Sequence, residues 1–115
     1  MKIGEERRDE TLIVTASGRI DSNSSSELER ALLGHTGSGE SRIVVDLAEV
    51  EYISSAGLRV LLMVAKKLQA TKGRLVLCAM PESVRLVFEL AGFLPIFAIE
   101  STRDAALARL AESGA

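Results

Sequence analysis

Two adjacent serines, Ser54 and Ser55, occupy the position in this chain that best suits a side chain for chemistry. They stand between a predicted buried strand and a predicted long helix, where a hydroxyl meets free backbone amides and the positive end of the helix dipole. Such a position can receive a phosphate, which would add about −1.5 to −2 charges. Serine is also a preferred helix N-cap, so capping explains one hydroxyl without any chemistry. A phosphorylation switch is one role open to the other.

A catalytic serine is not supported by the rest of the chain. It would need a base, and the only histidine, His35, lies in a different predicted segment; no G-x-S-x-G elbow is present. The segment Gly34–Ser41 has the spacing of a phosphate-binding loop, but Glu40 stands where that loop needs Lys, and the segment precedes a strand instead of following one. We therefore expect a surface loop over Gly34–Ser41, with His35 exposed to solvent.

The carboxylates Asp46, Glu49 and Glu51 form a second candidate cluster at the end of a predicted strand. Neighbouring carboxylates could bind a metal or perform acid–base catalysis. The stronger interpretation is structural: Asp46 satisfies backbone groups at the strand end, and the two glutamates face water.

The single cysteine, Cys78, has no disulfide partner and sits in an apolar run, which favours a small buried residue over a reactive thiol.

The composition limits the class of protein. The chain has 115 residues, of which 47% are hydrophobic and 26% charged, so residues 1–115 predict one globular domain. A net charge of −2 argues against a nucleic-acid partner. No apolar run approaches the roughly 20 residues of a membrane span, and the charged first ten residues lack a signal core. We therefore expect a cytoplasmic protein that binds no cofactor, no metal and no membrane.

The hydropathy pattern alternates between strand and helix periodicity. Strands are predicted at about residues 2–8, 12–17, 42–47, 74–79 and 96–99. Helices are predicted at about residues 25–33, 56–71 and 81–91, and through Ala106, Leu107 and Leu110. Ser24 and Glu27 match a capping box, Gly73 fits a helix C-cap, and Pro81 suits a first helical turn. The order β-β-α-β-α-β-α-β-α predicts an α/β fold whose central sheet is mixed and mostly parallel, with an N-terminal hairpin and about four helices.

At these residues the chain resembles the STAS domains and, among them, the single-domain bacterial anti-sigma factor antagonists. The resemblance covers nearly the whole chain and implies the STAS fold. It rests on Gly18–Asp21 after the second strand, on Val45–Ile53 leading into Ser54–Leu58, and on Ala91–Phe93. Each motif is weak alone, and the set is specific.

The resemblance also implies which serine accepts phosphate. The family typically reads Asp-Ser-Ser/Thr-Gly-Leu at its switch. When this chain is aligned on Gly57 and Leu58, the acceptor position falls on Ser55, while Ser54 takes the usual Asp position and Ala56 that of the second hydroxyl. Ser55 is therefore the expected phosphoacceptor, with Ser54 as the second choice.

The implied function is partner switching. The unphosphorylated protein would bind an anti-sigma factor, a serine kinase related to the ATPase domains of histidine kinases, and so release a sigma factor. Phosphorylation would end the binding, and a PP2C-type serine phosphatase would restore it. The protein would then be a ligand and substrate, not an enzyme. Two alternatives remain open: the same switch with an output other than a sigma factor, and a STAS subunit of a transport assembly.

The expected partner-binding surface surrounds the switch. We expect it to include Asp21, Ser22, Ser24, Ser54, Ser55, Ala56, Gly57, Leu58, Arg59 and Met63. Val60 and Val64 are also apolar, and they either extend this surface or belong to a wide stripe that faces the core.

Overall fold

The structure, a computed structural model, describes residues 1–37 and 41–113. Its strands are β1 (Lys2–Arg8), β2 (Thr11–Ile20), β3 (Arg42–Ile53), β4 (Arg74–Cys78) and β5 (Ala98–Glu100). Its helices are α1 (Ser25–Gly37), α2 (Ser55–Ala70), α3 (Glu82–Leu90) and α4 (Arg103–Ser113), with a 3-10 turn, η1 (Leu94–Ile96), before β5. The strands form one sheet in the order β1-β2-β3-β4-β5, in which β1 and β2 are antiparallel and all other neighbours are parallel. The predicted α/β class, mixed sheet and N-terminal hairpin are confirmed.

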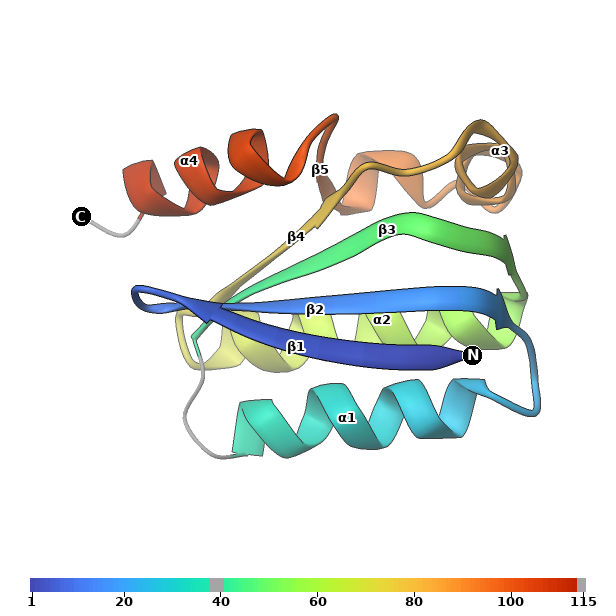
Figure 1. Cartoon of the computed structure of the whole chain (residues 1–115), viewed down its shortest axis with the longest axis horizontal. Coiled ribbons are helices and arrows are strands. Elements are labelled where there is room, and N and C mark those ends of the chain that lie inside the picture. The colour runs from blue at the N-terminus through green and yellow to red at the C-terminus, as the bar shows by residue number, and fades with distance from the viewer. Residues whose placement is uncertain (38–40, 114–115) are drawn as a thin grey trace.

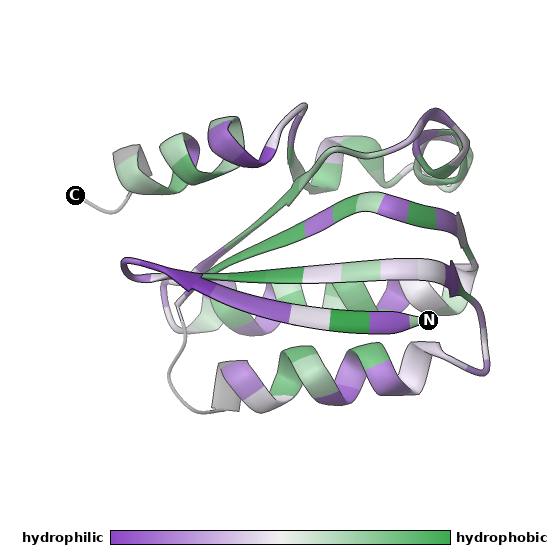
Figure 2. Cartoon of the chain, viewed as in Figure 1, coloured by the Kyte–Doolittle hydropathy of each residue, from purple (hydrophilic) through white to green (hydrophobic). Residues whose placement is uncertain are grey.

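The sheet has helices on both faces. Helices α1 and α2 lie along one face, and α4 lies against the other (Figure 1). The larger core cluster fills the space between the sheet, α1 and α2, and it also takes in Val84 and Phe88 of α3. A smaller cluster beneath α4 joins Val44 and Cys78 of the sheet to Leu110. Figure 2 shows the resulting contrast between mostly hydrophobic central strands and a largely hydrophilic β1. Among the described helices, none combines the length and hydrophobicity that a membrane span needs.

Strand β3 is longer than its hydropathy predicted. The continuous apolar run ends at Leu47, but the strand continues to Ile53 because it pairs in parallel with β2, which itself reaches Ile20. Two register shifts, between Thr15 and Ser17 and between Gly18 and Arg19, accommodate the extra length. The extension brings the end of β3 beside the end of β2, and α2 starts directly after it.

Helix α1 is also longer than predicted. Gly34–Gly37, expected to be loop, are its last residues; Ser41 precedes β3, and residues 38–40 lie outside the described part of the chain. One glycine costs a helix only about 1 kcal/mol relative to alanine, which does not end a helix whose Leu32 is fully buried. His35 is therefore not a solvated loop residue: its Nε2 lies 2.8 Å from Glu5 Oε2 of β1.

Three predicted element ends differ in detail. The left-handed residue after α2 is Lys72 (φ 64°), not Gly73, which is glycine for another reason: a Cβ there would lie 2.7 Å from the Ser41 carbonyl oxygen. Pro81 is the N-cap of α3, not a member of its first turn. The strand predicted at residues 96–99 begins only at Ala98, because Pro95 and Ile96 belong to the 3-10 turn that precedes β5.

Candidate functional site

Ser54 is the N-cap of α2. Its backbone is extended (φ −89°, ψ 170°), its Oγ accepts a hydrogen bond from the Gly57 amide at 3.3 Å, and its carbonyl accepts from the Leu58 amide at 3.0 Å. Its own amide donates to the Ile20 carbonyl at 2.7 Å. The hydroxyl and carbonyl of Ser54 therefore accept hydrogen bonds from the first turn of α2, and its amide links this turn to the end of β2.

Ser55 differs sharply from its neighbour. It is the first residue of α2 and is exposed to solvent. Within the described residues, its hydroxyl makes no hydrogen bond. The structure thus gives the capping role to Ser54 and leaves Ser55 as a solvent-facing hydroxyl at the positive end of a 16-residue helix.

The backbone of the first turn of α2 packs directly against side chains at the ends of β2 and β3. A Cβ on Gly57 would lie 2.7 Å from Ile20 Cγ2 and 2.8 Å from Ile53 Cγ1, so only glycine lets the helix approach the ends of β2 and β3 this closely. This contact fixes the position of Ser54 and Ser55 relative to both strands.

Part of the expected partner surface is buried. Leu58 is 1% exposed, Val60 4% and Val64 0%, and Gly57 is buried as well. The side chains of Leu58, Val60 and Val64 belong to the core. Leu58 therefore does not lie on the expected partner-binding surface, and Val60 and Val64 belong to the wide stripe that faces the core, one of the two alternatives that the sequence left open. The buried stripe is wide because α2 contacts α1 as well as the sheet. Of the other predicted surface residues around Ser55, Arg59 is exposed, and Ala56 and Met63 are half-buried.

The turn between β2 and α1 is organised by Asp21. Its Oδ1 accepts hydrogen bonds from the amides of Asn23 at 3.0 Å and Ser24 at 3.1 Å. The hydrogen bond from the Ser24 amide is the largest cause that holds the pKa of Asp21 below its ordinary value. The Asn23 amide, the Ser24 hydroxyl and the charge of Arg19 act in the same direction, whereas desolvation opposes them. Ser24 Oγ accepts from the Asp21 amide and donates to the Arg19 carbonyl, both at 2.9 Å. The predicted capping box is therefore wrong, because the Ser24 hydroxyl turns back to the strand and only its carbonyl accepts from Glu27.

Two loops thus meet at one end of the molecule. The β2–α1 turn and the β3–α2 turn follow adjacent parallel strands and lie at the same end of the sheet (Figure 1). In open α/β sheets this carboxyl edge is where binding sites are built. The structure brings the expected residues of both turns to this edge, with Ser22 exposed and Asp21 and Ser24 half-buried.

Sequence reasoning missed one feature of this edge. The Arg19 guanidinium carbon lies 4.4 Å from the ring centroid of Tyr52, a cation–π contact between neighbouring strands, and Tyr52 is 38% exposed. The two residues are register partners in the parallel pair. Arg19 and Tyr52 each stand one residue before the end of their strand, so pairing the ends of β2 and β3 would have placed these side chains next to each other.

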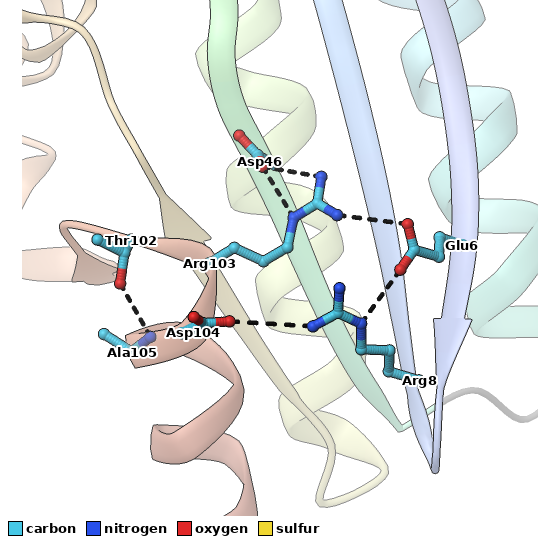
Figure 3. Close-up of polar contacts among 7 residues, drawn as sticks. All are labelled: Glu6, Arg8, Asp46, Thr102, Arg103, Asp104 and Ala105. Carbon is cyan, nitrogen blue, oxygen red and sulfur yellow. Dashed lines mark hydrogen bonds and ion pairs between the residues drawn. The ribbon is translucent and has the colours of Figure 1, made fainter.

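Asp46, one of the three candidate carboxylates, is held in polar contacts that join β3, β1 and α4 (Figure 3). Asp46 Oδ1 accepts a hydrogen bond from the Ala48 amide at 3.0 Å. Its Oδ2 accepts a hydrogen bond from Arg103 Nε at 3.0 Å and forms an ion pair with Arg103 Nη2, also at 3.0 Å. Arg103 Nη1 also lies 3.4 Å from Glu6 of β1. Asp46 does satisfy a backbone group, but it does so in the middle of β3 and not at its end. Glu49 and Glu51 are exposed, as expected.

Cys78 lies between the sheet and α4 with no exposed surface. Burial, and secondarily the charge of Asp46, raises the pKa of its thiol from 9.0 to about 11. A thiolate is therefore disfavoured, and the interpretation of Cys78 as a small buried residue is confirmed.

Comparisons with known proteins converge on one family. The sequence profile of the STAS domain matches residues 3–106. The proposed anti-sigma factor antagonist BtrV of Bordetella bronchiseptica is 45% identical over 108 residues, which cover 94% of this chain and 93% of BtrV.

Solved structures share the fold. An anti-sigma factor antagonist from Mycobacterium paratuberculosis has a TM-score of 0.88 at 28% identity, covering 95% of this chain and 92% of its own. The anti-sigma factor antagonist SpoIIAA of Bacillus has a TM-score of 0.84 in its unphosphorylated form (20% identity, 96% and 97% coverage) and 0.74 in its phosphorylated form (21%, 94% and 98%).

Proposed function

Because the chain belongs to the STAS domain family, we propose that it is an anti-sigma factor antagonist whose partner affinity is set by phosphorylation of Ser55. The unphosphorylated protein binds an anti-sigma factor that is a serine kinase with a histidine-kinase-like ATPase fold, and a sigma factor is released. The kinase then transfers the γ-phosphoryl group of ATP to Ser55 Oγ, releasing ADP and a proton, and the complex dissociates. A PP2C-type phosphatase hydrolyses the phosphoserine. The protein acts as ligand and substrate in the cytoplasm, where ATP is present.

The observation that carries this proposal is the difference between the structural roles of the two serine hydroxyls. Ser54 uses its hydroxyl to cap α2, whereas the exposed hydroxyl of Ser55 has no structural partner within the described residues. A phosphate on Ser55 would stand at a helix N-terminus, where free amides and the dipole favour an anion. SpoIIAA, which shares this fold, is known in unphosphorylated and phosphorylated forms, and the name of BtrV supports the role of antagonist.

The proposed partner surface follows from exposure around Ser55. Ser22 and Arg59 are exposed, and Asp21, Ser24, Ala56 and Met63 are half-buried. Gly57 and Leu58 support this surface from below without reaching it. A partner that covers Ser55 would have to desolvate a phosphate there. A penalty of a few kcal/mol would lower affinity by orders of magnitude, since about 1.4 kcal/mol is tenfold.

The experiment compares Ser55→Ala with Ser54→Ala. Each purified variant is incubated with the kinase and ATP, the phosphate is located by mass spectrometry, and kinase binding is measured by calorimetry. Ser55→Ala should take up no phosphate, bind the kinase constitutively and keep its stability within about 0.5 kcal/mol. Ser54→Ala should lose about 1 kcal/mol of stability with its cap and still be phosphorylated.

Two outcomes would contradict the proposal. Phosphate incorporation into Ser55→Ala at the wild-type level would move the acceptor to Ser54 or elsewhere. A wild-type protein that is fully phosphorylated on Ser55 and still binds the kinase with unchanged affinity would exclude the switch itself.

A further inference from the structure

A groove lies at the opposite end of α2 from Ser55. Since α2 has 16 residues, its two ends are separated by about 24 Å. The groove has a volume of about 550 Å³. It is lined by Ala65 and Gln69 of α2, by residues 72–75, by residues 95–98, and by Arg109 of α4. Nothing in the partner-switching proposal uses it.

The groove exists because the edge strand is short. Strand β5 pairs with β4 only from Val76 to Cys78, so Arg74 and Leu75 extend beyond it. The chain before β5 is taken up by the 3-10 turn η1 instead of continuing the strand. Leu75 and Phe97, 7% and 9% exposed, form an apolar floor beneath the gap.

The charged residues that line the groove are all cations. They are Lys72, Arg74 and Arg109, and no carboxylate belongs to the lining. Arg109 Nη1 is paired with Glu100 at 2.7 Å, so its charge is partly neutralised, but Lys72 and Arg74 form no ion pair with a carboxylate of residues 1–37 and 41–113. The positive charge that a ligand would meet therefore comes mainly from Lys72 and Arg74.

Hydrogen bonds within the chain reduce the negative partial charge that the end of α2 presents. The last carbonyls of a helix carry partial negative charge and would repel an anion. Here the Leu68 carbonyl accepts from the Thr71 and Gly73 amides, and the Gln69 carbonyl accepts from the Lys72 amide. These acceptors are satisfied within the chain.

We propose that this groove binds a small organic anion, with the anionic group at Lys72 and Arg74 and an apolar ring or short chain on Leu75 and Phe97. Its volume is within the roughly 300–1,000 Å³ typical of small-molecule sites, and it combines an apolar floor with cationic side chains that can bind an anionic group. The site is independent of the serine switch and of the partner surface around it.

The test uses 1-naphthyl phosphate as the probe, titrated into the ¹⁵N-labelled full chain while amide chemical shifts are followed by NMR. Inorganic phosphate and 1-naphthol serve as probes that keep only the charge or only the ring. Saturable shifts should be confined to the amides around the groove, those of residues 69–75 and 96–98, Ala65 and Arg109. Neither partial probe should produce them at the same concentration.

Matched variants test the charges. Replacing both Lys72 and Arg74 by Gln should weaken binding at least about tenfold, because the anionic group would lose both of its charge-assisted hydrogen bonds. The control replaces Lys66 and Lys67 by Gln. These residues are exposed on α2, do not line the groove and change the net charge equally, so the control should bind as wild type does.

Several results would overturn the proposal. Equal weakening in both double variants would show diffuse attraction to a positive surface instead of a site. Inorganic phosphate binding as tightly as 1-naphthyl phosphate would remove the role of the apolar floor. Shifts centred on the exposed Leu86 and Leu90 of α3 would place the probe elsewhere. A hexaglutamate peptide that shifts the groove amides when 1-naphthyl phosphate does not would identify an acidic protein segment as the ligand.

Discussion

Replacing Gly57 by alanine tests the backbone contact that positions the two serines. In an open helical position this change stabilises a helix by about 1 kcal/mol. At Gly57 the new Cβ would lie 2.7 and 2.8 Å from carbons of Ile20 and Ile53, both fully buried, so neither side chain can move aside freely. Overpacking of this kind costs about 1–3 kcal/mol, and two contacts under 3 Å favour the upper end. We expect Gly57→Ala to lose about 2 kcal/mol net.

The matched control is Gly34→Ala. Gly34 lies in α1 and is exposed, and apart from its chain neighbours and the nearby backbone of α1, no atom lies within 4 Å of the position its Cβ would take. This variant should gain about 1 kcal/mol, so the two glycine variants should differ by about 3 kcal/mol in urea unfolding monitored by circular dichroism. A Gly57→Ala protein that is stabilised as much as Gly34→Ala would refute the close approach of α2 to the ends of β2 and β3.

Three further predictions concern the polar groups of the fold. Arg103→Ala should destabilise the protein by about 2 kcal/mol in urea unfolding, because Asp46, 12% exposed, loses a charge-assisted hydrogen bond and an ion pair. Arg8, by contrast, is half exposed, so Arg8→Ala should change stability by less than about 0.5 kcal/mol. Cys78 should resist iodoacetamide in the native protein, and stability should fall as the pH rises from 9.0 towards about 11, because only the unfolded thiol then ionises. The lowered pKa of Asp21 makes its charged form stabilising, so wild type should lose its stability advantage over Asp21→Asn as the pH falls below 3.8 through the lower folded pKa, as measured by thermal melts.

The sequence predicts this fold well wherever the signal is local. The hydropathy periods of the strands and helices and the terminating Gly92 depend on residues close together in the chain, and these predictions agree with the structure. The length of β3 could not be predicted in this way, because its last six residues are held by pairing with β2, which comes from a distant part of the chain.

The same distinction applies to the sites. The serine pair is visible in the sequence, but the assignment of the cap to Ser54 depends on a backbone angle and on the distance to the Gly57 amide. The burial of Leu58 and Val60 requires knowing that α1 covers α2 as well as the sheet. The groove at Lys72 and Arg74 arises because β4 extends beyond its neighbour β5, and no local sequence motif predicts this difference in strand length.

The arrangement at the start of α2 predicts that a charge on Ser55 weakens partner binding without destabilising the fold. Ser54 caps the helix and Gly57 anchors it to the strands, and neither contact involves the Ser55 hydroxyl. The first turn of α2 carries no acidic residue, so Ser55→Asp should stabilise the helix by about 0.3–1 kcal/mol through the dipole. The same substitution should weaken kinase binding, because the carboxylate must be desolvated at the interface. Thermal melts and calorimetry should therefore move in opposite directions. A loss of stability that accompanies the loss of affinity would mean that the switch works by unfolding the site, and the division of roles between the two serines would be wrong.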